Sequence, residues 1–192
     1  MSTLNLDPRT TALVVIDLQR GIVGGQTVPF PAAKVVERAS RLAKAFRAKQ
    51  GLVVLVHVDP GPDGVLFPRL LTDVERPRLA MPPEAVQIVP EMGPEPGDVI
   101  VTKHQPSAFF GTDLELQLRR RKIDTIVLCG IATNIGVEST ARTGFEHGFN
   151  LVFVSDAMAA RDAELHDVAV KKYFPTIGRV RTTDEIVAAT SD

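Results

Sequence analysis

The sequence predicts a three-layer α/β/α fold, in which helices cover both faces of a central parallel sheet. Short, continuous apolar runs are typical of strands buried on both faces. They alternate along the chain with segments whose apolar residues recur at helical spacing. Of the 192 residues, 44% are hydrophobic and 23% are charged. This length and composition suit one globular domain, so we expect residues 1–192 to form a single domain.

Three apolar runs in the first half of the chain lead directly into polar residues. The predicted strands are residues 12–16, 52–56 and 99–102. Asp17, His57 and Lys103 follow these strands in turn. The carboxyl ends of parallel strands lie at one edge of the sheet, where open α/β sheets bind their ligands. We therefore expect Asp17 and Lys103 to meet at that edge, although position alone also fits an aspartate that caps a loop and a lysine on the surface.

The segments that join these strands are a helix and a long insert. Residues 21–31 are rich in glycine and proline and predict a loop, and the apolar spacing of residues 35–46 predicts a helix. The insert, residues 60–96, has a short helical pattern at 65–71 and a strand-like run at 86–89. Inserts of this length commonly form lids or partner surfaces, so we expect this one to set the substrate.

The second half of the chain continues the alternation. Its predicted strands are residues 125–128, residues 151–154, which end near Asp156, and a short edge strand at 179–181. Helix starts are predicted from capping residues. These are Thr112 with Glu115, Asp162 for a helix that runs to Tyr173, and Thr182 with Glu185.

The junction after residues 125–128 is where we place the active site. From Thr133 onward, Val137, Ala141 and Phe145 recur every four residues, which predicts a helix. The first amides of a helix have no intrahelical partner, and the helix dipole adds partial positive charge. A strand that ends at a helix N-terminus therefore favours an anion or a developing oxyanion.

Composition argues against several classes of partner. The chain has 22 basic and 23 acidic residues and a formal net charge of -1, so we expect neither nucleic acid nor an anionic membrane as partner. Its single cysteine excludes an intrachain disulfide. The N-terminal residues lack the pattern of a signal peptide, and no apolar run reaches membrane-spanning length. We expect a cytoplasmic protein.

Three separated segments carry a family resemblance: residues 14–19, residues 103–112 and residues 130–142. They resemble the acidic strand, the lysine segment and the nucleophile segment of the isochorismatase-like cysteine hydrolases. That family includes nicotinamidases, N-carbamoylsarcosine amidases and isochorismatases. The resemblance implies an isochorismatase-like hydrolase fold over nearly the whole chain.

The resemblance also implies roles for individual residues. Asp17, Lys103 and Gly136 correspond to catalytic positions, and the amides of Ala132 and Gly136 correspond to an oxyanion hole. It further implies a cis peptide bond before Ala132 and a homodimer or higher homo-oligomer. Two further residues in the matching segments, Gln19 and Phe109, are predicted to bind substrate. Nicotinamidases hold a metal near the position of His57; because no close second ligand follows His57 here, we expect no metal and no cofactor.

Gly136 departs from most of the family, whose members have the nucleophilic cysteine at this position. Without a thiol, the acyl-thioester route is closed. Cys129 lies seven residues earlier, inside a predicted strand, where a small buried apolar side chain is expected. Isochorismatases of this family also have glycine here, because they cleave a vinyl ether without a covalent acyl intermediate. A site that has lost its activity, or an engineered change, is the alternative explanation of Gly136.

These observations predict a hydrolase that acts on a small, anionic enol ether or a related substrate. Asp17 would protonate the vinyl carbon, and Lys103 would hold a carboxylate or support proton exchange at Asp17. A nearby lysine lowers the pKa of an aspartate, whereas an acid catalyst needs that pKa raised. The alternatives are a non-catalytic protein of the same fold that binds a small ligand, and an amide hydrolase in which Asp17 activates water.

Overall fold

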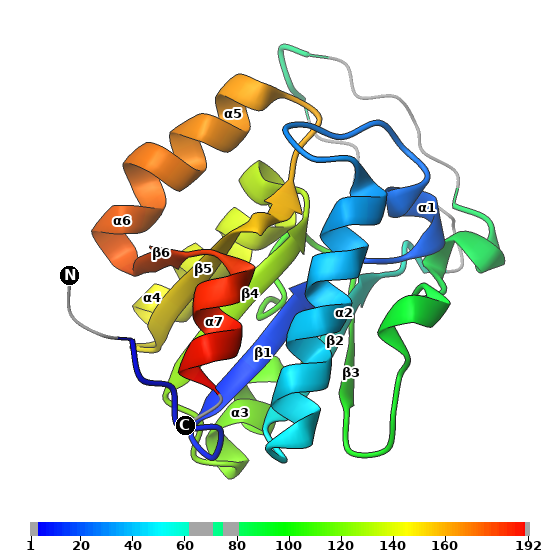
Figure 1. Ribbon diagram of the computed structural model, residues 1–192. Coiled ribbons are helices and arrows are strands. Elements are labelled where there is room, and N and C mark those ends of the chain that lie inside the picture. The colour runs from blue at the N-terminus through cyan, green and yellow to red at the C-terminus, as the bar shows by residue number, and fades with distance from the viewer. Residues whose placement is uncertain (1–3, 62–70, 75–80, 191–192) are drawn as a thin grey trace.

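The structure is a computed structural model, which describes residues 4–61, 71–74 and 81–190. Within these ranges, six parallel strands form one sheet in the order β3-β2-β1-β4-β5-β6 (Figure 1). The strands are β1 Thr11–Ile16, β2 Leu52–Val58, β3 Val99–Lys103, β4 Thr125–Ile131, β5 Asn150–Ala159 and β6 Arg179–Arg181. All six predicted strands, the edge strand included, are confirmed.

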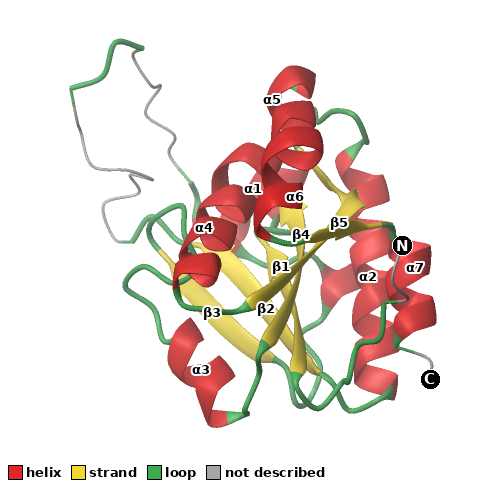
Figure 2. Ribbon diagram, turned by 90° about the vertical axis from the view of Figure 1, so that its left-hand side faces the viewer, coloured by secondary structure: helices red, strands yellow, loops and turns green. Residues whose placement is uncertain are grey.

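Helices cover both faces of the sheet, which confirms the predicted three-layer α/β/α fold. The α-helices are α1 Arg20–Val23, α2 Ala32–Ala48, α3 Leu114–Arg120, α4 Glu138–Glu146, α5 Ala163–Val168, α6 Phe174–Ile177 and α7 Thr183–Ala189. Helices α2 and α7 lie on one face, and α3, α4 and the α5–α6 segment lie on the other (Figure 2). No helix in the described part of the chain is long and apolar enough to span a membrane.

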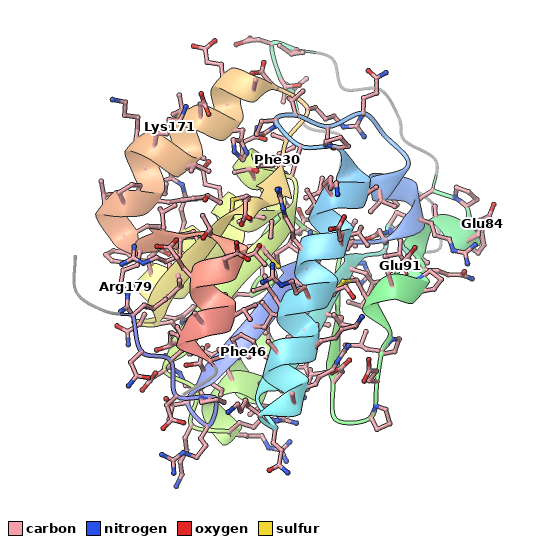
Figure 3. All side chains as sticks on the ribbon, viewed as in Figure 1. Phe30, Phe46, Glu84, Glu91, Lys171 and Arg179 are labelled. Atoms are coloured by element: carbon pink, nitrogen blue, oxygen red, sulfur yellow. The ribbon has the colours of Figure 1, made fainter. Side chains whose placement is uncertain are left out.

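Two apolar cores, one on each face, account for the continuous apolar runs. Every residue of β1 and β4 is buried, because both strands are central and covered on both sides. The predicted inner face of residues 35–46 is buried in α2, and its Phe46 side chain is fully buried. By contrast, charged residues such as Glu84 and Lys171 are exposed on the surface (Figure 3). The two layers of side chains thus fix the sheet between them.

The strand order reverses between β1 and β4. From the middle of the sheet outwards, β1, β2 and β3 follow one another to one side, and β4, β5 and β6 follow one another to the other side. In open α/β sheets, ligands bind in the crevice at the carboxyl ends of the strands where the order reverses. A ligand is therefore expected between the end of β1 and the turn that follows β4.

The insert differs from its prediction. Residues 86–89 do not form a strand: the 3₁₀-helix η1 covers Pro83–Val86, the 3₁₀-helix η2 covers Pro90–Met92, and only Ile88 makes an isolated bridge, to Gln19. Pro83 and Pro90 start the two 3₁₀-helices, and these leave too few extended residues between them for a strand. The helical pattern at 65–71 lies outside the described residues except for Leu71, which is not helical.

Two of the three predicted helix caps are confirmed. Asp162 accepts hydrogen bonds from the first turn of α5, and Thr182 forms a capping box with Glu185 at the start of α7. The box predicted for Thr112 and Glu115 is wrong. The Thr112 hydroxyl instead donates to the Ala108 carbonyl and accepts from the Leu114 amide, because it belongs to the preceding turn.

Two further expectations need correction. Phe145 is half exposed, whereas Val137 and Ala141 are fully buried. Steps of four residues drift by about 40° each around a helix of 3.6 residues per turn, so the third residue leaves the buried face. Asp156 does not end its strand, because β5 continues past it to Ala159.

Candidate active site

Asp17 stands directly after β1, in the middle of the sheet. Its backbone is left-handed, with φ of 54°, and its amide donates a hydrogen bond of 2.9 Å to the Val56 carbonyl at the end of β2. Aspartate adopts this conformation more readily than most residues with a side chain. The chain therefore turns sharply here, and the residue is only 6% exposed.

Lys103, the last residue of β3, reaches the Asp17 carboxyl across the neighbouring strand β2. Its Nζ lies 2.8 Å from Asp17 Oδ2 and donates a hydrogen bond of 3.3 Å to the Gln105 carbonyl. Only 3% of the lysine side chain and 8% of the aspartate side chain are exposed. The structure thus brings together the two charged residues that the sequence placed at one sheet edge.

Burial dominates the electrostatics of Asp17. Its Oδ1 atom is buried and has no hydrogen-bond partner among the residues that the structure describes. Burial raises the pKa of Asp17 because the charged form loses solvation, and this outweighs Lys103 and His57, which lower it. A buried oxygen without a partner is rare in folded proteins and indicates where a ligand or water would bind.

Gly130 allows β4 to pass close to β1. Its φ of 122° lies in a region that glycine tolerates and other residues do not. A Cβ at this position would lie 2.1 Å from the Ile16 carbonyl oxygen. Only glycine therefore fits where the chain leaves the sheet for the active-site turn.

The turn after β4 begins with a cis peptide bond between Ile131 and Ala132, as predicted. A π-helical turn, η3 Thr133–Val137, follows and continues directly into α4. The Ala132 carbonyl accepts hydrogen bonds from the amides of Ile135 (3.1 Å) and Val137 (3.2 Å). The helix thus starts at Thr133, as the apolar spacing predicts, with a wider first turn than an α-helix.

This turn brings Gly136 against the charged pair. A Cβ at Gly136 would lie 3.1 Å from Asp17 Oδ2, 3.7 Å from Lys103 Nζ and 2.8 Å from Ile16 Cγ2. The three positions predicted to be catalytic, Asp17, Lys103 and Gly136, therefore adjoin one another between the end of β1 and the turn after β4.

Gln19 and Phe109 do not join this group as predicted. The Gln19 side chain is buried and fully used: its Nε2 donates to the Val58 and Ala85 carbonyls, and its Oε1 accepts from the Val58 amide. It ties β1 to β2 and to the insert. The Phe109 ring instead packs against Phe149, which directly precedes β5 and so lies at the amino ends of the strands, away from Asp17. An aromatic ring gains more from this apolar burial than from an open loop position.

His57 lies beside the pair but its ring is engaged. Its Nδ1 faces the Val86 carbonyl at 3.0 Å, and its Nε2 faces the Thr102 hydroxyl at 2.8 Å. Because a carbonyl only accepts hydrogen bonds, Nδ1 carries the proton. No group of three or more histidine, cysteine, aspartate or glutamate side chains suited to a metal occurs in the described ranges.

Cys129, Thr133 and His166 are further buried polar residues near the turn. Cys129 is fully buried in β4, and burial raises its pKa to about 12. The Thr133 hydroxyl lies 2.9 Å from Nδ1 of His166 in α5, a contact that the sequence analysis did not foresee. The only signal for it in the sequence is the position of His166 in the helix that Asp162 caps.

The comparisons with known proteins identify the family. The sequence model of the isochorismatase domain matches residues 11–185. The chain belongs to the isochorismatase family. It is 48% identical to the isochorismatase family protein YwoC of Bacillus subtilis, over 97% of each chain. It is 30% identical to the isochorismatase of Bacillus subtilis, over 86% of this chain and 53% of that protein.

Solved structures of the isochorismatase family agree with this assignment. An isochorismatase family protein from Burkholderia thailandensis is 46% identical and superposes with a TM-score of 0.94, over the full length of both chains. Isochorismatase family members are hydrolases, so the fold described above is that of a hydrolase family.

Proposed function

We propose that the protein hydrolyses the enol-ether bond of a small anionic substrate such as isochorismate, with Asp17 as the general acid. The supporting observation is the Asp17 carboxyl itself. It is buried, its Oδ1 is without a partner among the described residues, and the position that carries the nucleophile in cysteine hydrolases is occupied by Gly136. The resulting site has an acid and a cation but no thiol.

The reaction begins with transfer of the Asp17 proton to the terminal vinyl carbon of the enol ether. A C–H bond forms, the C=C π bond breaks, and the ether oxygen stabilises the adjacent cation. Water adds to the internal carbon that bears the ether oxygen, and a proton of this water returns to the Asp17 carboxylate. The hemiketal then collapses: the bond between this carbon and the ether oxygen breaks, the oxygen stays on the ring, and the hemiketal hydroxyl proton passes to it. The products are pyruvate and a cyclic alcohol.

Burial of Asp17 supports its role as an acid. A general acid must hold its proton at the working pH, and burial raises the pKa of Asp17 despite the adjacent Lys103 ammonium. Lys103 would hold a substrate carboxylate or return a proton to Asp17, since its Nζ already lies 2.8 Å from Asp17 Oδ2. The amides of Ala132 and Gly136 would stabilise negative charge on the departing oxygen.

Amide hydrolysis through a thioester is a poorer fit. It requires a thiolate that can reach the substrate. Cys129 is fully buried in β4 and burial raises its pKa to about 12, so it stays a neutral thiol at physiological pH.

The direct test is to incubate the protein with isochorismate and measure pyruvate with lactate dehydrogenase and NADH. Asp17→Asn keeps the shape of the side chain but removes the acid, and we expect it to lower the rate by about 10²–10⁴-fold. Asp113→Asn, at an exposed helix start, is the matched control and should retain full activity. Ligand binding without turnover would support the non-catalytic alternative. Ammonia release from amides, abolished by Asp17→Asn, would support the amide hydrolase.

We also propose that the chain forms a homodimer or a larger homo-oligomer. Several large apolar side chains are exposed on the single chain, among them Ile100, Phe110, Leu116 and Phe145. Stable homodimer interfaces commonly bury about 2,000 Å² or more. Light scattering at micromolar concentration should give a mass above the 20.8 kDa of one chain. A cytoplasmic location and the absence of a nucleic-acid partner stay predictions from the composition.

A further inference from the structure

A buried pair, Thr133 and His166, links the active-site turn to a distant helix. Thr133 is the first residue of η3, which continues into α4, and His166 lies 33 residues later in α5. Helix α4 and the α5–α6 segment cover the same face of the sheet (Figure 2). The Thr133 Oγ1 and His166 Nδ1 atoms are 2.9 Å apart. Thr133 is fully buried and His166 is only 4% exposed.

Because both groups are buried, loss of this one hydrogen bond would be costly. A buried hydroxyl or imidazole that loses its partner keeps the cost of its desolvation. Burial also lowers the pKa of His166, which keeps the ring neutral at neutral pH. In the neutral ring either Nδ1 or the Thr133 hydroxyl can be the donor. The pair therefore holds in either tautomer, as a hydrogen bond between neutral groups.

The position of η3 matters because Gly136 lies within the same turn. A Cβ at Gly136 would be only 3.1 Å from Asp17 Oδ2, so a small displacement of η3 changes the space beside the carboxyl. The partner of Thr133 is itself fixed, since the Asp162 side chain caps the first turn of α5. The helix thus provides a rigid support outside the turn.

We propose that His166 is a positioning residue, which acts through Thr133 to hold the η3 turn against Asp17. The kinetic part of this inference rests on the proposed enol-ether hydrolysis; the structural part does not. His166 has no assigned contact with substrate, so its effect should appear as geometry at the turn rather than as chemistry at the imidazole.

Four substitutions separate the hydrogen bond from the shape of the side chains. Thr133→Val keeps the shape and removes the hydroxyl, whereas Thr133→Ser keeps the hydroxyl. His166→Asn places an amide near the position of Nδ1, whereas His166→Gln places it near Nε2. We expect Thr133→Val and His166→Gln to lower kcat by roughly tenfold to a hundredfold, because small misplacements at an active site have effects of that size. The KM should change by less than about threefold, and Thr133→Ser and His166→Asn should retain most of the kcat.

A double variant tests whether the two residues act together. If they share one interaction, Thr133→Val with His166→Gln should be no slower than either single variant, since residues in direct contact are not additive. Arg142→Ala is the control for a loss of contacts other than the Thr133–His166 hydrogen bond. It removes the guanidinium that lies 3.7 Å from the centre of the Tyr173 ring, after α5, and that pairs with Glu138 Oε1 at 2.8 Å within α4. This variant should lower the melting temperature and leave kcat unchanged.

Hydrogen exchange gives a readout that does not depend on turnover. Thr133→Val and His166→Gln should speed exchange of the amides of residues 133–138, and Arg142→Ala should leave them protected. If the unmodified protein releases no pyruvate from isochorismate, the proposed function fails, and exchange alone decides the positioning role. Unchanged exchange in both variants, an additive double variant, or a kcat that follows melting temperature in all variants would overturn it.

Discussion

Replacing Gly136 by alanine adds one methyl group at the centre of the site. Its Cβ would lie 2.8 Å from Ile16 Cγ2 and 3.1 Å from Asp17 Oδ2, both closer than ordinary packing allows. Gly136 is not among the glycines with positive φ, so alanine meets no backbone penalty there. The cost of Gly136→Ala is therefore a packing cost, carried by Ile16 and Asp17.

Overpacking of this kind costs about 1–3 kcal/mol. For a chain of this size, each kcal/mol lowers the melting temperature by about 2–4 °C, so we expect a fall of roughly 2–12 °C in calorimetry. The same displacement moves the Asp17 carboxyl, and pyruvate release from isochorismate should fall with it.

Two substitutions at Ile16 test the origin of the cost. Ile16→Ala removes Cγ2, so adding Gly136→Ala to it should cost less than it does in the unmodified protein, by about 1 kcal/mol of coupling. Ile16→Val is the matched control, because it keeps Cγ2 and loses only the terminal methyl. A Gly136→Ala protein with an unchanged melting temperature, or equal coupling with both Ile16 variants, would refute the packing described here.

Three further predictions concern the same site. A thiol introduced by Gly136→Cys should react with an alkylating agent while Cys129, whose pKa burial raises to about 12, stays silent in the unmodified protein; an unreactive thiol with unchanged ligand binding would place position 136 outside the site. Because burial raises the pKa of Asp17 above its ordinary 3.8, kcat/KM should be full below that raised pKa and fall as pH rises through it. A flat profile would contradict an Asp17 acid. Gly130→Ala should lower the free energy of unfolding, measured with denaturant, by at least about 1–3 kcal/mol, because its φ of 122° is strained for alanine and its Cβ would lie 2.1 Å from the Ile16 carbonyl oxygen; an unchanged free energy of unfolding would contradict this backbone conformation.

The fold could be predicted from the sequence because each central strand is a continuous apolar run. Where a strand contains polar residues, the pattern fails. Residues 151–154 were recognised, but β5 continues through Asp156 because its carboxylate accepts hydrogen bonds from the Thr183 amide and hydroxyl. The hydrogen-bond donors for Asp156 come from Thr183, at the start of α7 and 27 residues away, so no local sequence pattern predicts them. The presence of β5 could therefore be predicted from its apolar run, but its length depends on tertiary contacts.

The sequence predicts which site residues meet when their place at the end of a strand brings them together. It does not predict the direction in which a side chain points. Asp17 and Lys103 end parallel strands, so topology alone brings them to one edge. Gln19 is only two residues from Asp17, yet its amide is used by the backbone of β2 and the insert. The Thr133 and His166 contact spans 33 residues, and apolar spacing carries no information about it.

The packing around Ile16 bears on whether Gly136 marks a lost activity. A site that had merely lost a thiol would leave a space beside Asp17 about the size of the missing side chain. Here the position of even the first carbon atom of such a side chain is taken, since it would lie 2.8 Å from Ile16 Cγ2. At Gly130, a Cβ would meet the backbone of the same residue, Ile16. The end of β1 and the turn after β4 therefore interlock through two glycines, and the close approach of the turn to Asp17 depends on both. Glycine at position 136 therefore fits the packing of this site, as the proposed reaction without a thiol requires.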